Sequence, residues 1–251
     1  MIPGIFPENI STYGSEIDTL FWVITAITLI ALVISLYVLL KPLFTNVHTK
    51  VKRASYITGY EKKNMRWIVY ALVGLTLGDF LILYVEHPTW VKLEQTIPDP
   101  DFEVGIIGKQ WNWIFVYPGP DGKLYTKDDV RVDQMNSELH LPVNKNIVVH
   151  LMATDVLHSF WVSQIRLKQD CIPGRTNKRW FNIIKEGKYE LVCAEICGVL
   201  HSKMRNFIVS ESEEAFQKHL SALYAPKTES SESTGADNKS LTEVPLANAS
   251  K

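Results

Sequence analysis

The chain begins with two long apolar stretches. Residues 20–40 contain no charged side chain, and these 21 positions are enough for a helix to cross a bilayer. A second stretch over 67–86 is interrupted by Gly74, Gly78 and Asp79. A secretory signal peptide fits the first stretch poorly, because residues 1–19 contain no Lys or Arg. The pattern predicts a transmembrane helical hairpin over 20–86.

The loop 41–66 between the two spans is basic. It carries 7 Lys and Arg residues and a single acid, Glu61, whereas no basic residue precedes the first span. Short basic loops remain in the cytoplasm, so we expect a cytoplasmic loop, an external N-terminal segment 1–19 and an external domain after the second span. This topology predicts a multi-pass protein of the bacterial inner membrane with a periplasmic domain, or of the mitochondrial inner membrane if the source is eukaryotic.

The residue pattern from 94 to 224 is that of a β-rich domain. Short runs of Val, Ile, Tyr, Phe and Trp alternate with polar residues and are separated by turn sequences. The predicted strands are 105–117, 147–153, 179–184 and 189–194, in a sandwich or small barrel. Residues Ser210–Glu213 have the form of a capping box, which predicts a short amphipathic helix ending near Tyr224. The polar residues 225–251 are predicted to be a disordered tail.

Charge and cysteine content exclude two classes of protein. The 26 Lys+Arg residues against 27 Asp+Glu residues exclude a strongly basic nucleic-acid binder. The 3 cysteines exclude a disulfide framework for a domain of this size.

The chemistry is concentrated in one short segment. Soft or borderline metal ligands gather there, with one more upstream: His158, Cys193, Cys197, His201 and Met204. Thiolate, imidazole and thioether together form a copper-binding set. A mononuclear site needs only one cysteine, whereas two thiolates can bridge two copper ions, with one histidine capping each. The weak axial positions would then go to Met204 and to a backbone carbonyl of the loop.

Two other interpretations of this segment are open. A disulfide between Cys193 and Cys197 would explain neither His201 nor Met204. A structural zinc site does not call for a thioether, and its cysteines usually lie closer in sequence. Ligand chemistry therefore favours copper. His158 taken alone is typical of a satisfied strand histidine.

Four motifs carry a resemblance to a known family. They are Gly108–Trp113, Asp155–Phe160, Asp170–Arg175 and Cys193–Met204. Through them the chain resembles subunit II of heme-copper terminal oxidases of the cytochrome c oxidase type, over roughly residues 15–220. The resemblance implies a membrane-anchored all-β fold, in which a two-helix transmembrane hairpin precedes a cupredoxin-like β-barrel or sandwich at 94–224.

The resemblance also implies a ligand set for a binuclear copper centre, called CuA. Cys193 and Cys197 would bridge two copper ions, His158 and His201 would cap them, and Met204 and the backbone carbonyl of Glu195 would be axial. The Glu195 side chain would face a magnesium or manganese ion shared with subunit I. Trp111 would mark the surface where cytochrome c delivers its electron. Asp155 and Asp170 would orient ligands or support the subunit interface, and Arg175 would lie near the heme propionates of the large subunit.

The implied function is respiratory. The chain would take electrons from cytochrome c, or from a tethered cytochrome c domain, and pass them to the heme-copper subunit that reduces oxygen to water and pumps protons. Its partners would be subunit I, other oxidase subunits and membrane lipids, with no nucleic acid. Two alternatives are the copper subunit of a nitric oxide reductase and a membrane-anchored periplasmic copper-binding protein. The second alternative would not need Trp111.

The sequence departs from the family at several positions. Asn64 stands where the family usually has a glutamate that serves a proton channel, and Glu61 lies one turn earlier. Asp79 should face protein or water within the membrane, unless the helix ends or tilts so that it reaches the outer surface. We expect Cys171 to be a buried free thiol.

Overall fold

The structure divides into two compact units. It is a computed structural model that describes residues 6–45, 56 and 58–225. One unit runs from Ser15 to Thr96, and the other begins at Ile97 and includes the N-terminal segment up to Gly14. The centre of the predicted loop 41–66 and residues 226–251 of the predicted tail lie outside the described residues.

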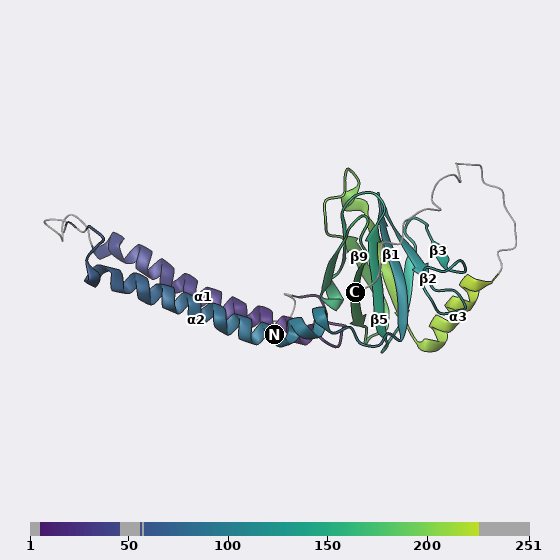
Figure 1. Ribbon diagram of the computed structural model, residues 1–251, viewed down its shortest axis with the longest axis horizontal. Helices are drawn as coiled ribbons and strands as arrows, with labels where there is room; N and C mark the ends of the chain where they lie inside the picture. The colour runs from purple at the N-terminus through teal and green to yellow at the C-terminus, as the bar shows by residue number, and fades with distance from the viewer. Residues whose placement is uncertain (1–5, 46–55, 57, 226–251) are drawn as a thin grey trace. The chain divides into compact units, whose positions relative to one another are not determined.

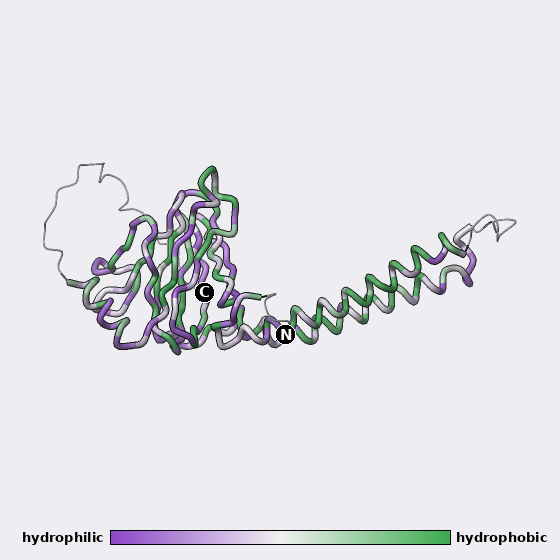
Figure 2. The backbone as a smooth tube through the Cα atoms, turned by 180° about the vertical axis from the view of Figure 1, so that it is seen from behind, coloured by the Kyte–Doolittle hydropathy of each residue, from purple (hydrophilic) through white to green (hydrophobic). Residues whose placement is uncertain are grey.

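The first unit is a helical hairpin. Helix α1 (Gly14–Thr45) and helix α2 (Lys62–Trp90) run side by side, and a π-helical turn η1 (Val91–Gln95) continues α2 (Figure 1). Both helices are long and apolar enough to span a membrane, and Figure 2 shows their hydrophobic course. They extend beyond the predicted spans because a helix satisfies its own backbone hydrogen bonds through the headgroup layer as well as the hydrocarbon. Lys92 Nζ lies 2.6 Å from Glu16 Oε1 and joins the two helices at their outer end.

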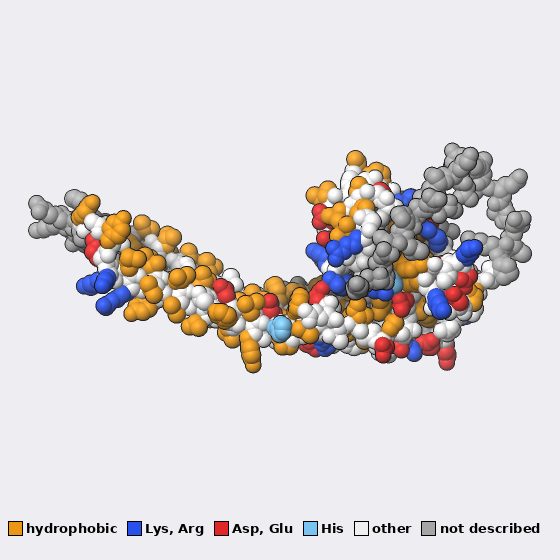
Figure 3. All heavy atoms as spheres, in the orientation of Figure 1, with side chains coloured by type: hydrophobic (Ala, Val, Ile, Leu, Met, Phe, Trp, Pro, Cys, Tyr) orange, Lys and Arg blue, Asp and Glu red, His pale blue; other side chains and the backbone are white. Residues whose placement is uncertain are grey.

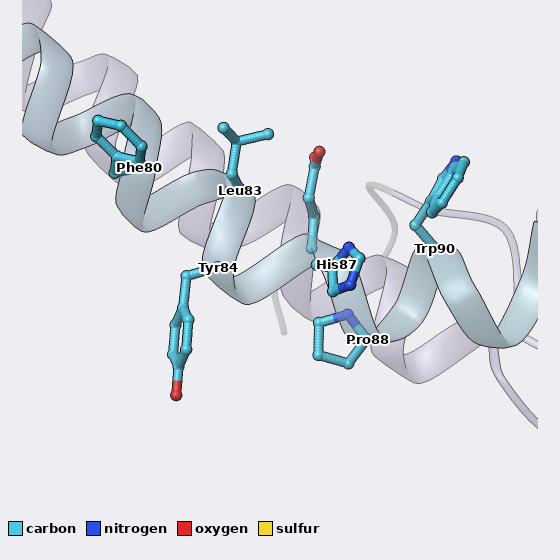
Figure 4. A pocket seen from close by; sticks show the side chains of 7 residues that line it. Phe80, Leu83, Tyr84, His87, Pro88 and Trp90 are labelled. Atoms are coloured by element: carbon cyan, nitrogen blue, oxygen red, sulfur yellow. The ribbon is translucent and has the colours of Figure 1, made fainter.

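Aromatic side chains gather at the outer end of α2. Figure 4 shows a largely apolar hollow lined by Phe80, Leu83, Tyr84, Glu86, His87, Pro88 and Trp90. The His87 and Trp90 rings stack with centroids 6.4 Å apart. Trp and Tyr favour the membrane–water interface, so this end of the helix has the composition expected at a boundary of the predicted span.

The second unit is a sandwich of two five-stranded sheets (Figure 1). The first sheet has the order β3-β2-β1-β5-β8 and the second the order β4-β10-β9-β6-β7. Their strands are β1 (Phe102–Lys109), β2 (Asn112–Tyr117), β3 (Val130–Val132), β4 (Glu138–Pro142), β5 (Asn146–Ala153), β6 (His158–Val162), β7 (Leu167–Cys171), β8 (Asn177–Asn182), β9 (Gly187–Cys193) and β10 (Arg205–Glu211). The strands β1 and β5 are parallel, as are β4 and β10, and all other pairs are antiparallel. Two apolar helices followed by a cupredoxin-like sandwich confirm the predicted fold class.

One predicted strand is wrong. The stretch 105–117 is a tight hairpin, in which β1 pairs antiparallel with β2 and Lys109 faces Asn112 across the turn Gln110–Trp111. The turn contains no Gly or Pro, and the aromatic residues Trp111, Trp113, Phe115 and Tyr117 continue the pattern of a strand, so the sequence gives no sign of it. Trp113 is consequently buried in the strand, whereas Trp111 lies in the turn and is partly exposed. A single strand over 105–117 would place Trp111 and Trp113 on the same face, whereas in the hairpin they do not share one.

The core between the sheets is aromatic. Trp113, Phe115, Phe160 and Phe181 are completely buried. The Trp113 and Phe160 rings meet edge to face, with centroids 6.2 Å apart. Burial of each such side chain stabilises the fold by about 1.5–3 kcal/mol. Together these side chains fix the spacing of the two sheets next to β6, whose first residue is the copper-ligand candidate His158.

The N-terminal segment is part of this unit. Ser11 forms a β-bridge with Ile183, and the backbone N–H of Ile184 donates to the Ile10 carbonyl at 2.8 Å. Ile10 and Tyr13 are buried, and the Tyr13 ring packs edge to face on Trp180. The sequence predicts only an external segment here, because a single short strand carries no distinctive pattern.

A C-terminal helix closes the unit. Helix α3 (Glu213–Tyr224) buries Phe216 and Leu220. Its N-cap is Ser212, whose hydroxyl accepts from the Ala215 N–H, and Ser210 belongs to β10. The helix therefore begins two residues later than the predicted capping box, because the strand continues further than its apolar pattern indicated.

Candidate metal centre

The candidate ligands meet at one end of the second sheet. Cys193 ends β9 and His158 begins β6, and these strands are paired, with Phe160 opposite Cys193. The loop after β9 carries Cys197 and the short helix η3 (His201–Lys203), and it returns into β10. Pairing of β6 with β9 thus brings the upstream histidine to the cysteine loop, although 35 positions separate His158 from Cys193.

The two cysteines and two histidines form a paired arrangement. The sulfur atoms Sγ of Cys193 and Cys197 are 3.8 Å apart, and both thiols are free. His158 Nδ1 lies 3.9 Å from Cys193 Sγ, whereas His201 Nδ1 lies 3.6 Å from Cys197 Sγ. Each sulfur therefore has its own imidazole.

Two weaker donors complete the cluster. Met204 Sδ lies 3.8 Å from Cys197 Sγ, and the Glu195 carbonyl oxygen lies 3.2 Å from Cys193 Sγ. Met204 is almost completely buried, so its thioether is held away from water. The structure thus brings together all six residues that the sequence proposed around the metal.

Asp155 orients His158. Its Oδ1 accepts a hydrogen bond from His158 Nε2 at 2.8 Å, which leaves Nδ1 directed at the cysteine sulfur. Partial burial would raise the pKa of Asp155, but hydrogen bonds from Gln110 and His158 lower it. A carboxylate behind a ligating imidazole is the usual support of a metal-bound histidine.

The thiols differ in acidity in a way that suits a metal. Burial alone would raise the pKa of Cys193, but the hydrogen bond from His158 and others lower it to about 6. Burial and then the neighbouring charge of Cys193 raise the pKa of Cys197 to about 12. The Cys193 thiolate forms readily, and its negative charge opposes ionisation of Cys197. Bound cations would remove this repulsion, so the donor set fits copper.

Two glycines allow the close approach of these segments. A Cβ at Gly108 would lie 2.9 Å from three atoms of the His158 side chain. Gly198 has a φ of +125°, and a Cβ there would lie 3.2 Å from the Trp111 ring. Gln110 connects the same segments, since its Nε2 donates to the Cys197 carbonyl at 2.7 Å and its backbone N–H donates to Asp155. Sequence reasoning missed Gln110, and its place beside Trp111 in the motif was the only available signal.

The remaining predicted residues lie nearby or carry no resolved role. Cys171 is buried and lies opposite His158 in the pairing of β6 with β7. Burial raises the pKa of the Cys171 thiol to about 12. It is therefore a protonated free thiol. Asp170 pairs with Ser159 in the same ladder. Arg175 lies in the turn before β8, where its backbone N–H donates to the Ile172 carbonyl.

Comparisons with known proteins point to one family. Residues 102–212 match the family model described as cytochrome c oxidase subunit II, periplasmic domain. The alternative cytochrome c oxidase subunit 2 of Bradyrhizobium diazoefficiens is 32% identical over 194 residues, which cover 69% of this chain and 68% of that protein. Cytochrome c oxidase subunit 2 of Thermostichus vulcanus is 43% identical over 118 residues, which cover 47% of this chain and 32% of that protein.

A solved structure is also similar. The crystal structure of the periplasmic domain of subunit II of the cytochrome oxidase of Bradyrhizobium japonicum is 30% identical, covers 51% of this chain and 96% of that chain, and gives a TM-score of 0.45. The matched domain follows two helices able to span a membrane, so the chain is membrane-anchored with a periplasmic domain. The chain belongs to the cytochrome c oxidase subunit II family.

Proposed function

We propose that this chain takes electrons from cytochrome c and passes them, through a binuclear copper centre, to the heme-copper subunit that reduces oxygen to water and pumps protons. The carrying observation is the pair of sulfur atoms 3.8 Å apart, each with its own imidazole. Family membership supports copper binding and partnership with subunit I.

The proposed ligands are the six clustered residues. The metal would be held by the thiolates of Cys193 and Cys197, the imidazoles of His158 and His201, the thioether of Met204 and the backbone carbonyl of Glu195. When bound, two copper ions sharing two thiolates supply a one-electron redox centre. The chain itself holds the donors in place: Asp155 fixes the His158 ring, and two paired strands fix the positions of His158 and Cys193.

The geometry supports two metal ions over one zinc ion. Donor atoms of His158, Cys193 and Cys197 lie within 4.8 Å of one another, whereas His201 does not belong to that group. A single tetrahedral zinc would require all four donors to converge. The histidines instead approach different sulfurs, and both cysteines remain reduced, which disfavours the disulfide interpretation as well.

Trp111 is the proposed contact where electrons enter. Its ring packs against Gly198 of the ligand loop and is partly exposed, so one side chain reaches from the surface to the cluster. Gln110, the preceding residue, is hydrogen-bonded to Cys197. A donor that docks on Trp111 would therefore contact a residue fixed to the ligand loop.

Further parts of the proposal follow from the family. The half-buried Glu195 side chain would face a magnesium or manganese ion shared with subunit I, which must supply further oxygen ligands. The hairpin would lie in the bacterial inner membrane among lipids, with the loop 41–66 in the cytoplasm. The donor would be a soluble or tethered cytochrome c.

The test is the copper content and spectrum of the full chain. Purified in mild detergent and loaded with copper, it should bind two copper ions per chain, and its EPR spectrum should show an electron shared by two equivalent copper nuclei. Cys197→Ser should bind fewer and lose that pattern, while Cys171→Ser should preserve it. A wild-type chain with one copper and the hyperfine pattern of one nucleus would refute the binuclear centre.

A further inference from the structure

The middle of the ligand loop, residues 195–200, is weakly packed. Ile196 and Val199 are 83% and 90% exposed, so most of their side-chain surface is open to solvent. Figure 3 shows hydrophobic side chains gathered at the end of the outer domain where this loop lies in Figure 1. Cys197 is nevertheless buried between these exposed residues. Packing of its neighbours therefore does not explain how Cys197 keeps its place.

Among the residues that the structure describes, a single hydrogen bond joins 195–200 to the chain outside the loop 193–204. The side-chain Nε2 of Gln110 donates to the Cys197 carbonyl at 2.7 Å. The remaining hydrogen bonds of 195–200 in the described chain are made with residues of the same loop. Gln110 is thus the polar anchor of the segment that carries the second cysteine.

Gln110 reaches the other half of the site through its backbone. Its N–H donates to Asp155 Oδ2 at 2.7 Å, and Asp155 Oδ1 accepts from His158 Nε2 at 2.8 Å. One residue of the turn between β1 and β2 is therefore connected to His158 and to Cys197. The backbone N–H is present with any side chain except proline, so a substitution of Gln110 removes only the connection to Cys197.

The same contact fixes the peptide on which Trp111 rests. A Cβ at Gly198 would lie 3.0 Å from Gln110 Nε2 and 3.2 Å from Trp111 Cζ2, so both side chains press against this glycine. Its φ of +125° is accessible to glycine and rarely to other residues. A hydrogen bond that holds the Cys197–Gly198 peptide therefore also holds the loop surface beneath the Trp111 ring.

We infer that Gln110 is a positioning residue of the proposed copper centre, whose side-chain amide holds the Cys197 half of the site in its ligating geometry before metal binds. The physical reason is preorganisation. A loop that is free in the metal-free chain must be ordered when metal binds, and the entropy lost in that step opposes binding. The identity of the metal rests on the proposed function, whereas the anchoring of the loop rests on the contacts of Gln110 alone.

The test uses the full chain in mild detergent. Gln110→Leu, and Gln110→Glu, whose carboxylate cannot donate to a carbonyl, should each lower the copper affinity about 10–100-fold in competition with a chelator. In the copper-free variants, hydrogen exchange of 194–204 should become faster, because the His201 N–H is bonded to the Gly198 carbonyl next to the lost contact. Gln134→Leu, the same substitution at an exposed position between β3 and β4, should match the wild type.

Three results would overturn the inference. The first is wild-type copper affinity and wild-type exchange in Gln110→Leu. The second is wild-type behaviour of Gln110→Glu beside a defective Gln110→Leu, because side-chain packing rather than the donated hydrogen bond would then matter. The third is faster exchange throughout the outer domain with lower stability in urea, which would make Gln110 a general structural residue. Failure of the proposed function is separate, since the wild-type chain would then lack the two-copper spectrum while the exchange of the copper-free variants would still report on the anchor.

Discussion

A methyl group at Gly108 should disturb the copper site more than the fold. In Gly108→Ala the new Cβ would lie 2.9 Å from Cβ, Cγ and Cδ2 of His158. Carbon atoms prefer a separation of about 3.5–4.0 Å, so the histidine side chain must move by roughly 0.5–1 Å. It cannot move freely, because its Nε2 is held by Asp155 at 2.8 Å. Overpacking of this kind costs about 1–3 kcal/mol of stability.

The copper affinity should fall further than stability alone would suggest. Displacing a supported ligand reduces metal affinity by about 10–100-fold, and we expect Gly108→Ala to lie in this range. Urea unfolding of the copper-free chain measures the stability, and competition with a chelator measures the affinity. Gly105→Ala is the matched control on the same strand, where the added Cβ meets Val116 at 3.1 Å. It should lose stability and retain copper affinity. Wild-type affinity in Gly108→Ala would refute the steric argument.

Three further predictions follow. Trp111→Gln should slow reduction of the copper centre by cytochrome c in stopped-flow experiments, lowering kcat more than KM. Trp113→Phe should instead lower the free energy of unfolding by about 1–3 kcal/mol. A wild-type rate of reduction in Trp111→Gln would leave Trp111 as a packing residue. Burial and then the charge of the stacked His140 lower the pKa of His219. The unfolded chain therefore binds a proton more readily, so the free energy of unfolding decreases as the pH falls below the pKa of His219 in the unfolded chain. His219→Phe should flatten the acid side of the pH profile of stability, and an unchanged slope would contradict this. Ser55→Cys, outside the described residues, should resist labelling from outside intact cells, whereas efficient labelling would contradict the cytoplasmic loop.

The sequence predicted what depends on local pattern. Two long apolar runs indicated the helices, because a membrane span needs about 20 predominantly apolar residues in a row. The ligand loop was recognisable because Cys193, Cys197, His201 and Met204 are close in sequence, and the family prediction was confirmed. His158 could be added only through its motif.

Long-range contacts were beyond sequence reasoning. The hydrogen bond from Gln110 to Cys197 joins residues 87 positions apart, and nothing in either segment announces it. The hairpin turn at Gln110–Trp111 lacked the usual turn residues, so the positions of Trp111 and Trp113 were not distinguished. Such features depend on how sheets assemble, which local periodicity does not encode.

The pairing of the N-terminal segment with the outer domain has a consequence for how the protein is made. Ile10 and Tyr13 belong to the outer domain, yet the ribosome makes them before both membrane helices, and their contacts Ile184 and Trp180 come after. The domain can close only once both helices have been threaded and the later strands have emerged on the same side as the N-terminus. A truncated chain that starts at residue 97 would leave Trp180 without its cover, so soluble versions of the domain should carry residues 6–14 through a short linker.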